Sequence, residues 1–363
     1  MAGILKKLEV LGRRILFLGI APGVSTGNVL SSLPEPVNNI LIMRQDRIGD
    51  MIMTLPLIRR IRETNPDIRI GIVASESNRI ILKYETDFDI LTYRKDPWSF
   101  ISSLVEAWNL KPDAVVDMHM HDSTTSFIYA MFSGAKWKVH IDRESRLPFN
   151  VRVDAPQDGH IMDAFAGLLS GLGNRIETVS LRREVSLSVK ETGFAEEFWN
   201  SSGASPENCV AVNISAGSAN RRWGVDRYAL VCRHILKLGF KPLLIYSPGD
   251  SSSAEAVNRL EPGVLVSPVT PDILYLAALI RNVSLLVSPD TSVIHLAASY
   301  GIPVAGMYLP FDSSLPKWYP WHVRNRVLVS RDEGSLDSIH PDMILDAVKE
   351  LIALKEESFE NRF

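Results

Sequence analysis

Short apolar runs alternate with longer amphipathic stretches along most of the chain. The runs at residues 39–43 and 210–214 are dominated by aliphatic and β-branched residues, which is typical of strands buried on both faces of a parallel sheet. The stretch at 226–238 instead repeats apolar residues at helical spacing. Because strands and helices alternate in this way, we predict an α/β protein built on doubly wound parallel sheets.

The length of the chain indicates that these strands and helices belong to two domains. With 363 residues the chain is too long for one ordinary core and suits two domains of roughly 150 residues each. We predict a first domain over residues 37–185 and a second over 186–345, with the chain loosening between about 180 and 205. An extension (1–36) precedes them, and a helix with a tail (346–363) follows. Further strands are predicted at 68–74, 90–93, 114–117, 136–141, 242–246, 283–287 and 304–308.

Composition and charge exclude several classes of protein. Hydrophobic residues make up 46% of the chain and charged residues 22%, as in folded proteins. The formal net charge of −3 gives no reason to expect a nucleic-acid partner. Two cysteines provide no disulfide framework, and His119 and His121 have no neighbouring Cys, His or Glu cluster to complete a metal site. We therefore expect no bound metal.

The amino-terminal extension differs from the rest of the chain. Within residues 1–30 four basic residues outweigh one acidic residue, and the apolar run at 15–20 is far shorter than the roughly 20 residues that span a bilayer. Apolar residues share one helical face with basic residues around it: Leu5, Leu8, Leu11 and Ile15. Residues 1–30 are therefore expected either to bind an anionic membrane surface or to dock on the protein itself.

A polar turn follows the strand predicted at 283–287. Asp290, Thr291 and Ser292 are all good N-cap residues, and a helical pattern begins directly after them. The unpaired N–H groups and positive dipole of such a helix start favour a phosphate group. The alternative is an ordinary capped turn with no ligand.

A second candidate anion site follows the strand at 210–214. Ser215 and Gly217 lie in a loop of small residues that ends with Arg221, Arg222 and a tryptophan. Small residues let backbone amides approach an anion, and guanidinium groups add fixed donors. No Gly-Lys-Ser/Thr motif closes the loop and no GxGxxG motif follows a strand, which argues against a P-loop protein and a dinucleotide dehydrogenase. Asp250, after the next strand, is expected to contact a ribose or to be a solvated turn residue.

Candidate residues of the first domain also follow strands. The strand at 39–43 runs into Arg47, Gly49 and Asp50, where a helix begins. Glycine allows a close approach of the backbone or a positive φ, and Asp50 is expected to be either a helix-capping residue or a general base. Pro56 fits the first turn of a helix that starts near residue 54, or kinks one that starts at 49. His119 follows the strand at 114–117, where such folds bind ligands.

Three stretches resemble glycosyltransferase family 9, the ADP-heptose:lipopolysaccharide heptosyltransferases. Residues 40–62 (ILIMRQDRIGDMIMTLPLIRRIR) look like the family's first strand, turn and helix. Residues 213–223 (NISAGSANRRW) look like its phosphate-side loop, and residues 288–308 resemble its Asp-Thr/Ser-Gly-x-x-His-Leu signature. The motifs occur in the family's order and spacing from about residue 38 to residue 353.

This resemblance implies the GT-B fold, with two Rossmann-like lobes and a site in the cleft between them. The reaction would be inverting, independent of metal and free of cofactors, and would transfer a sugar, most simply heptose from ADP-heptose, to a lipopolysaccharide core or similar glycolipid at the cytoplasmic membrane face. Asp50 would be the base and Arg221 would hold the diphosphate. The remaining donor-side residues would be Asp290, Thr291, Ser292, Ser215, Gly217, Arg222, Asp250 and His295, and the acceptor-side residues Arg47, Gly49 and His119.

The sequence departs from the family pattern at four positions. Ser292 replaces the signature glycine, Arg221 the commoner lysine, Gly224 a proline, and Asp250 a glutamate that is one methylene longer. These changes leave the donor open, so another nucleotide sugar is an alternative. A nucleotide-sugar epimerase or hydrolase of the same two-lobed fold is a second alternative, and a nucleotide-binding module without catalysis is a third.

Overall fold

The computed structural model describes residues 33, 35–119, 123–140, 148–152, 159–170, 172, 178, 181–310 and 318–360. Contacts within the chain divide it into two units that meet in sequence at Arg182 and Arg183. One short segment, Ile48–Met53, groups with the second unit although its neighbours in sequence belong to the first. No helix in the described residues is long and apolar enough to cross a membrane.

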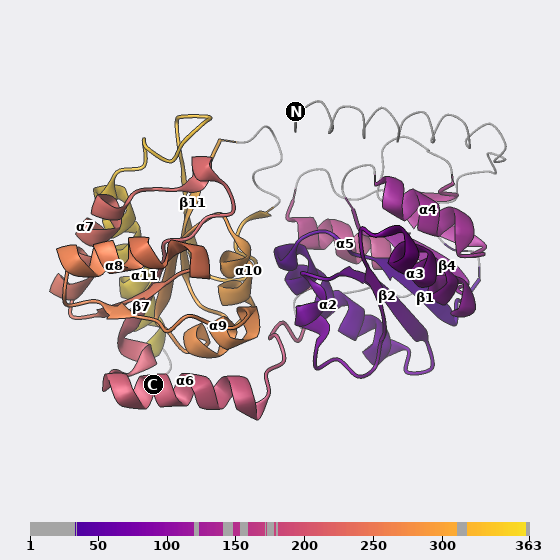
Figure 1. Cartoon of the computed structure of the whole chain (residues 1–363), viewed down its shortest axis with the longest axis horizontal. Helices are drawn as coiled ribbons and strands as arrows, with labels where there is room; N and C mark the ends of the chain where they lie inside the picture. Colours follow the sequence, from indigo (N-terminus) through magenta and orange to yellow (C-terminus); the bar gives the residue numbers. More distant parts are fainter. Residues whose placement is uncertain are drawn as a thin grey trace. The chain divides into compact units, whose positions relative to one another are not determined.

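A six-stranded parallel sheet forms the centre of the first unit (Figure 1). The strands lie in the order β3-β2-β1-β4-β5-β6. Their bounds are β1 (Asn39–Met43), β2 (Arg69–Ser75), β3 (Asp89–Tyr93), β4 (Ala114–Asp117), β5 (Trp137–His140) and β6 (Val151–Arg152). The helices are α2 (Ile48–Thr64), α3 (Pro97–Asn109), α4 (Thr124–Phe132) and α5 (Ile161–Ser170), with a 3-10 turn η2 (Arg79–Leu82).

Helices α3 and α4 cover one face of this sheet. Their residues Ala107 and Tyr129 join Leu41 of β1 and Val115 of β4 in one buried cluster. The central strand β1 pairs with β2 on one side and β4 on the other, and its last four residues are fully buried. The apolar runs in the sequence therefore form strands that are covered on both faces.

The second unit repeats the same plan. Its six parallel strands lie in the order β12-β11-β10-β7-β8-β9. They are β7 (Cys209–Asn213), β8 (Lys241–Ile245), β9 (Leu265–Val266), β10 (Leu285–Pro289), β11 (Val304–Tyr308) and β12 (Asn325–Val329). The helices are α6 (Val189–Ser202), α7 (Val225–Lys237), α8 (Ser251–Leu260), α9 (Ile273–Ile280), α10 (Ser292–Ser299) and α11 (Pro341–Glu360), with 3-10 turns η3 (Pro206–Asn208), η4 (Ala219–Arg221) and η5 (Pro248–Asp250).

Both sheets have the strand order of the dinucleotide-binding fold. In each sheet the first strand in sequence lies beside the fourth. The direction of winding therefore reverses between β1 and β4 in the first unit, and between β7 and β10 in the second. Ligands of such sheets bind outside the carboxyl ends of the strands at this reversal. The predicted class, doubly wound parallel sheets in two Rossmann-like domains, is confirmed.

The structure corrects the prediction for residues 180–205 and decides between the two positions predicted for Pro56. The stretch at 180–205, expected to be loose, contains helix α6, which begins with a capping box in which Ser188 and Glu191 satisfy each other's backbone N–H groups. Helix α2 begins at Ile48, so Pro56 lies inside the helix rather than in its first turn. The missing N–H of this proline falls within the helix, where it removes one backbone hydrogen bond.

Candidate active site

Asn213 organises the reversal point of the second sheet. It is the last residue of β7 and is 2% exposed. Its side-chain Nδ2 donates to the Oγ of Ser288 (3.0 Å) and to the Oγ1 of Thr291 (3.2 Å). Its Oδ1 accepts a hydrogen bond from the backbone N–H of Ser215 (3.1 Å). One amide therefore joins the loops that follow β7 and β10, the two loops that carry the predicted phosphate-binding residues.

Thr291 and Ser292 form the start of helix α10. Thr291 is the N-cap residue, with extended backbone angles, but its side chain makes no capping hydrogen bond. Its hydroxyl instead accepts from Asn213. Thr291 therefore does not cap the helix with its side chain, which does not support the interpretation of Asp-Thr-Ser as a purely capping turn. The first N–H groups of α10 receive no hydrogen bond from that side chain.

Arg221 lies against this helix start. Its Nη1 donates to the backbone carbonyl of Asp290 (3.0 Å) and forms an ion pair with the Asp290 Oδ2 (3.1 Å). Both side chains are 19% exposed, so they are held in place yet reachable from solvent. A fixed guanidinium thus stands beside the positive end of a helix dipole, an arrangement that favours an anion such as a diphosphate.

Asp250 is the last residue of η5, the 3-10 turn that follows β8, and it is buried rather than solvated. Its Oδ2 accepts from the hydroxyls of Ser215 (2.6 Å) and Ser247 (2.8 Å), and its Oδ1 pairs with the Nη2 of Arg222 (3.2 Å). Burial raises the pKa of this carboxyl, but the two hydroxyl donors and Arg222 outweigh it and hold the pKa below its ordinary value. Asp250 is therefore an ionised, oriented hydrogen-bond acceptor.

Trp223 anchors the loop that carries Arg221 and Arg222. The indole is buried, and its Nε1 donates to the carbonyl of Ile339 (2.8 Å) while its ring packs edge-on against Tyr228. Gly217, in the same loop, is exposed and lies in open space. The tryptophan of the motif thus has a structural role, and it fixes the point from which the two arginines extend.

The first turn of α2 contacts the start of α10 within the second unit. A Cβ atom built on Gly49 would lie 2.7 Å from the Cδ2 of His295 and 3.5 Å from the Cα of Ser292. The glycine does not have a positive φ, so close approach is the reason for it. Asp50 follows directly, is 8% exposed and occupies the first turn of α2. The predicted base is therefore one residue away from the contact with the predicted phosphate-binding helix.

We expect Gly49→Ala to lower the free energy of unfolding by about 1–3 kcal/mol, because the added methyl overlaps the imidazole of His295. That ring is 9% exposed and lies edge-on to the indole of Trp318, with ring centroids 6.5 Å apart. Thermal and urea unfolding measure the effect. Gly217→Ala is the matched control, since its new methyl meets nothing within 4 Å. Combining Gly49→Ala with His295→Ala should cost less than the two single losses together, and strict additivity would contradict the contact.

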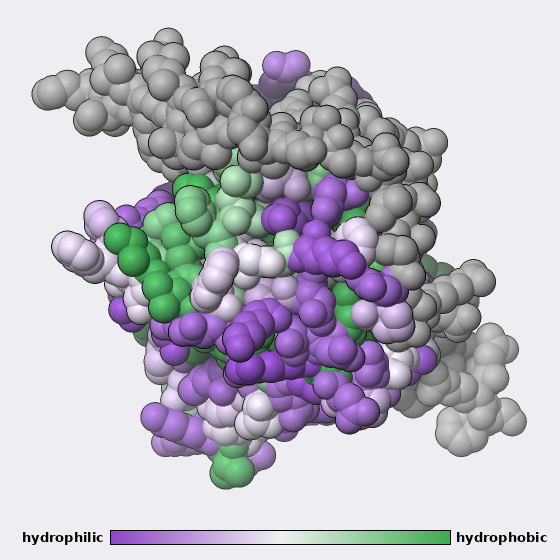
Figure 2. Space-filling view, turned by 90° about the vertical axis from the view of Figure 1, so that its right-hand side faces the viewer, coloured by the Kyte–Doolittle hydropathy of each residue, from purple (hydrophilic) through white to green (hydrophobic). Residues whose placement is uncertain are grey.

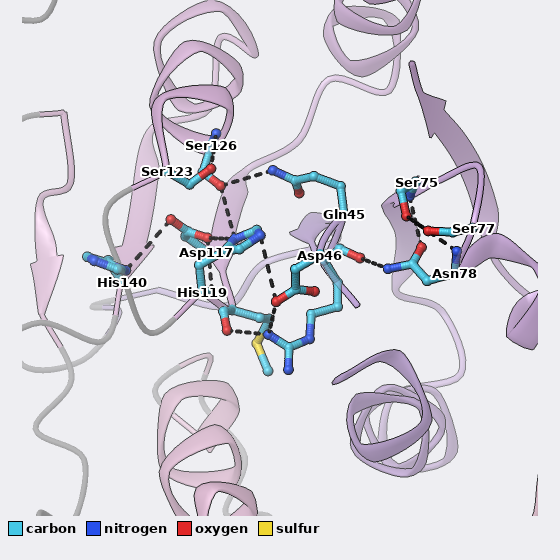
Figure 3. A network of polar contacts seen from close by, with 12 residues as sticks. Gln45, Asp46, Ser75, Ser77, Asn78, Asp117, His119, Ser123, Ser126 and His140 are labelled. Atoms are coloured by element: carbon cyan, nitrogen blue, oxygen red, sulfur yellow. Dashed lines mark hydrogen bonds and ion pairs between the residues drawn. The ribbon is translucent and has the colours of Figure 1, made fainter. Parts of the chain in front are cut away.

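A network of polar side chains occupies the corresponding reversal point in the first unit (Figure 3). His119 is 9% exposed, and its Nδ1 lies 2.5 Å from the Oδ1 of Asp117, the last residue of β4. The Oγ of Ser126 lies 3.1 Å from the same nitrogen and accepts a hydrogen bond from the Nε2 of Gln45 (3.3 Å). The Nε2 of His119 faces the Oδ2 of Asp46 at 3.9 Å. The loop after β1 and the end of β4 are therefore joined through one histidine.

Two buried oxygens in this network have no hydrogen-bond donor among the residues that the structure describes. They are the Oε1 of Gln45 and the Oδ1 of Asp46. The other oxygen of Asp46 pairs with the Nη1 of Arg44 (3.1 Å), whose guanidinium also stacks on Phe165. Because buried acceptors are normally satisfied by protein or water, these two oxygens can accept hydrogen bonds from water or from the hydroxyl groups of a ligand.

The charge of His119 is set by its carboxylate neighbours. Burial lowers the pKa of the imidazole, but the hydrogen bond to Asp117 and the charges of Asp117 and Asp46 outweigh burial and the opposing effect of Arg44, so the pKa is raised. A raised folded-state pKa means that the charged imidazole stabilises the protein fully below its ordinary pKa of about 6.5. This stabilisation disappears as the pH rises through the folded-state pKa.

We therefore expect the difference in free energy of unfolding between wild type and His119→Gln to be largest near pH 6 and to shrink toward pH 9. Urea titrations across this range measure it. His340→Gln is the matched control, because His340 is exposed. A pH-independent difference for His119→Gln would contradict a charged imidazole.

The remaining candidate residues fall outside these clusters or outside the described residues. Arg47 is exposed in the turn between β1 and α2. His121, the second member of the HxH pair, and residues 1–30 lie outside the described residues. Within those that are described, no group of three His, Cys, Asp or Glu side chains could hold a metal ion. Asp117 lies at the carboxyl end of β4, the position at which the sequence predicts ligand-binding residues. Three further residues of the two clusters were not predicted, and all lie at or just beyond the ends of central strands: Asn213, Gln45 and Asp46.

Comparison with known proteins places this arrangement in a family. The model of glycosyltransferase family 9 (heptosyltransferase) matches residues 111–347. The lipopolysaccharide core heptosyltransferase OpsX of Haemophilus influenzae is 23% identical over 285 residues, covering 76% of this chain and 80% of that protein. Lipopolysaccharide heptosyltransferase 3 of Escherichia coli is 23% identical over 296 residues, covering 75% of this chain and 83% of that protein.

Solved structures show the same fold. A family 9 glycosyl transferase from Veillonella parvula superposes with a TM-score of 0.75 at 20% identity, covering 89% of this chain and 99% of that one. Heptosyltransferase WaaC of E. coli, solved with ADP, gives 0.66 at 16% identity and covers 86% and 97%. The fold is the GT-B fold that the sequence motifs imply. Since the family model spans more than half of the chain, the protein belongs to glycosyltransferase family 9 and is a glycosyltransferase of the heptosyltransferase type.

Proposed function

We propose that the enzyme transfers heptose from ADP-heptose to a sugar of a lipopolysaccharide core or a similar surface glycolipid. Membership of the heptosyltransferase family supports the sugar, and the names of the two curated relatives support the acceptor. The observation that carries the proposal is the contact of Arg221 with Asp290 at the start of α10, on the reversal point of the second sheet.

The donor would bind along the carboxyl ends of β7, β8 and β10. Arg221 and the N–H groups of Thr291 and Ser292 would hold the diphosphate, since both provide donors to an anion. Asp250, ionised and oriented by Ser215 and Arg222, would accept hydrogen bonds from the ribose hydroxyls. His295 packs beside this site and would shape it rather than bind the sugar.

The transfer would proceed with inversion and without a metal ion. Asp50 would take the proton from an acceptor hydroxyl as its oxygen forms a bond to the anomeric carbon of the donor. The bond from that carbon to the diphosphate oxygen would break on the opposite side, and ADP would leave. Arg221 and the dipole of α10 would stabilise the charge that develops on the diphosphate, the role that a metal ion has in other enzymes.

The acceptor would bind to the network of the first unit. The free oxygens of Gln45 and Asp46 would accept hydrogen bonds from sugar hydroxyls, and the imidazole of His119 would donate to an oxygen. The amino-terminal residues 1–30 would add attachment to the cytoplasmic face of the membrane through their basic and apolar residues.

Incubation of the purified enzyme with single nucleotide sugars tests the proposal. ADP-heptose, ADP-glucose, UDP-N-acetylglucosamine and GDP-mannose are each offered with and without a de-acylated core oligosaccharide, in the presence of a chelator. We expect release of ADP from ADP-heptose only when the acceptor is present, and a product heavier by one heptose whose anomeric configuration is the opposite of the donor's. Release of the nucleotide without acceptor would indicate a hydrolase, and isomerised donor an epimerase. Turnover of another donor would replace the heptose assignment, and loss of activity with chelator would contradict metal independence.

A further inference from the structure

Helix α3 has an apolar stripe on the side that faces solvent. Four large residues occupy one side of it at positions i, i+3, i+7 and i+10, and their side chains are 82%, 51%, 53% and 58% exposed: Trp98, Ile101, Val105 and Trp108. On the opposite side Ser103 and Ala107 are buried against the sheet. The helix is therefore apolar toward the core and toward water, whereas an ordinary surface helix is polar on its outer face.

The stripe continues onto the end of α4. The two helices pack together through Phe100 and Tyr129, whose rings meet edge to face at 5.7 Å. Phe132, the last residue of α4, is 56% exposed. The ring of Trp108 lies against Gly134 just beyond it, where an added Cβ would come within 3.0 Å of the indole. We refer to Trp98, Ile101, Val105, Trp108 and Phe132 together as the α3–α4 face.

This face stands out from the rest of the surface. Helix α3 has 13 residues and α4 has 9, yet Glu106 is the only charged residue in either. Since 22% of the chain is charged, about five charged residues would be expected in helices of this combined length. Figure 2, which faces this side of the first unit, shows hydrophobic residues gathered in one region with hydrophilic residues beside it. Single exposed apolar residues are normal, but a contiguous group marks an interaction surface.

The size of the face argues against a second copy of the chain as its partner. An aromatic side chain offers roughly 150–250 Å² when fully buried, so three partly exposed aromatics and two aliphatic residues offer roughly 500 Å². A stable protein interface needs about 800 Å² from each partner, with direct hydrogen bonds across it. The α3–α4 face does not reach that area.

The residue types fit the boundary between lipid headgroups and acyl chains. Tryptophan is enriched at this boundary because its ring is apolar and its N–H is polar, and Trp98 and Trp108 lie at the two ends of the stripe. Lys95 and Lys111 bracket the helix and are exposed, with no ion pair to any described residue. Lysines at the ends of an inserted helix reach the headgroups while their stems cover apolar surface.

We propose that the α3–α4 face docks on the surface of a phospholipid bilayer, with Trp98, Ile101 and Val105 inserted at the headgroup–acyl boundary. The charges around α3 nearly cancel, because Asp96 and Glu106 oppose the two lysines. Attachment through this face therefore rests on apolar burial and persists at high salt, unlike attachment through the basic segment 1–30, which salt screens. The proposal does not depend on which sugar or acceptor the enzyme uses.

Flotation of the full-length protein with vesicles tests this proposal. Vesicles of phosphatidylethanolamine and phosphatidylglycerol are used in about 0.5 M salt, where charges on the surface are strongly screened. We expect the combined variant Trp98→Ser, Ile101→Ser, Val105→Ser to lower the partition coefficient by about tenfold or more, because three inserted side chains are lost. Trp108 is left unchanged, since its ring packs on Gly134.

The matched control replaces three exposed apolar residues that lie apart on the second unit. Val189→Ser, Leu260→Ser and Val269→Ser remove side chains that are 87%, 47% and 50% exposed. This control should partition like wild type. Both combined variants should keep the wild-type thermal protection by ADP, which separates loss of docking from misfolding and from failure of the proposed function.

Tryptophan fluorescence locates the inserted face directly. Lipids with brominated acyl chains should quench part of the wild-type emission, and Trp98→Phe should remove a measurable share of that quenching, although six other tryptophans remain among the seven of the chain. The proposal would be overturned if the combined variant of Trp98, Ile101 and Val105 (the stripe variant) had the same partition coefficient as the control variant. It would also be overturned by binding that vanishes entirely in high salt, which would assign attachment to residues 1–30, or by a concentration-dependent dimer that the stripe variant abolishes.

Discussion

Replacement of Asp50 by asparagine is expected to lower sugar transfer by about 10²–10⁴-fold and to leave donor binding nearly unchanged. The substitution keeps the size of the side chain and most of its hydrogen bonding, but it removes the carboxylate that we propose takes the acceptor's proton. The loss should appear in kcat and in kcat/KM alike, because proton removal assists the transition state and not the binding of the donor. Steady-state kinetics with varied donor and acceptor measure the three quantities.

A control is needed because Asp50 could act as the general base or could only stabilise the start of α2 through the helix dipole. Asp163 occupies the first turn of α5 and is exposed, so Asp163→Asn measures the generic effect on a helix start. We expect it to change stability slightly and transfer not at all. Near-normal turnover by Asp50→Asn, together with a loss of stability like that of Asp163→Asn, would assign Asp50 a capping role.

The architecture could be predicted from the sequence because the central strands are apolar over most of their length. Strands β1 and β10 are buried on both faces, and the short polar turns that follow them begin helices at Ile48 and Ser292. Continuous burial requires continuous apolar sequence, so local pattern and tertiary environment agree there. Strand β12 was not predicted. It lies at the edge of its sheet and is only partly buried along its length, so its sequence need not be continuously apolar.

Helix α6 shows a local signal that the sequence did contain. Its capping box, Ser188 with Glu191, has the Ser-x-x-Glu spacing that marks the start of a helix. The helix has few buried residues, so its apolar periodicity is weak and the stretch resembles a linker. A short cap motif is therefore the better indicator wherever a helix lies on the surface.

The partners of the site residues could not be predicted, because they lie far apart in sequence. Asn213 and Thr291 are 78 positions apart, and Arg221 and Asp290 are 69 apart. The sequence identifies Arg221 and Asp290 separately as strand-end residues, but only the sheet order brings β7 beside β10 and so brings the two residues together. Asn213 begins the motif at 213–223, but its role could not be inferred, since one amide at the end of an apolar strand is not distinguishable from a chance polar residue.

Arg221→Gln is expected to lower kcat by about 10²–10³-fold and to weaken donor binding as well. Charge develops on the diphosphate as the glycosidic bond breaks, so a fixed cation there stabilises the transition state more than the bound donor. The structure adds a second cause, because Arg221 pairs with the carboxylate of Asp290. Without the guanidinium, that carboxylate would be left uncompensated beside the proposed diphosphate site and would repel the diphosphate.

These two causes can be separated by substitution. Arg221→Lys restores the charge without the forked geometry and should recover part of both losses. The double variant Arg221→Gln, Asp290→Asn removes the repulsion and should bind donor better than Arg221→Gln alone, while its kcat stays low. Equal donor affinity of the single and double variants would show that Asp290 does not face the diphosphate.

Arg222 provides the matched control, since it is the adjacent arginine and has a different partner. It pairs with Asp250, which keeps its hydrogen bonds to Ser215 and Ser247 when the arginine is lost. Arg222→Gln should therefore be much milder than Arg221→Gln. ADP should raise the unfolding temperature of wild type and of Arg222→Gln, and that of Arg221→Gln much less, because stabilisation by a ligand follows its affinity for the folded state. Equal protection of all three proteins would place the diphosphate elsewhere and would remove the main support for the second unit as the donor-binding domain.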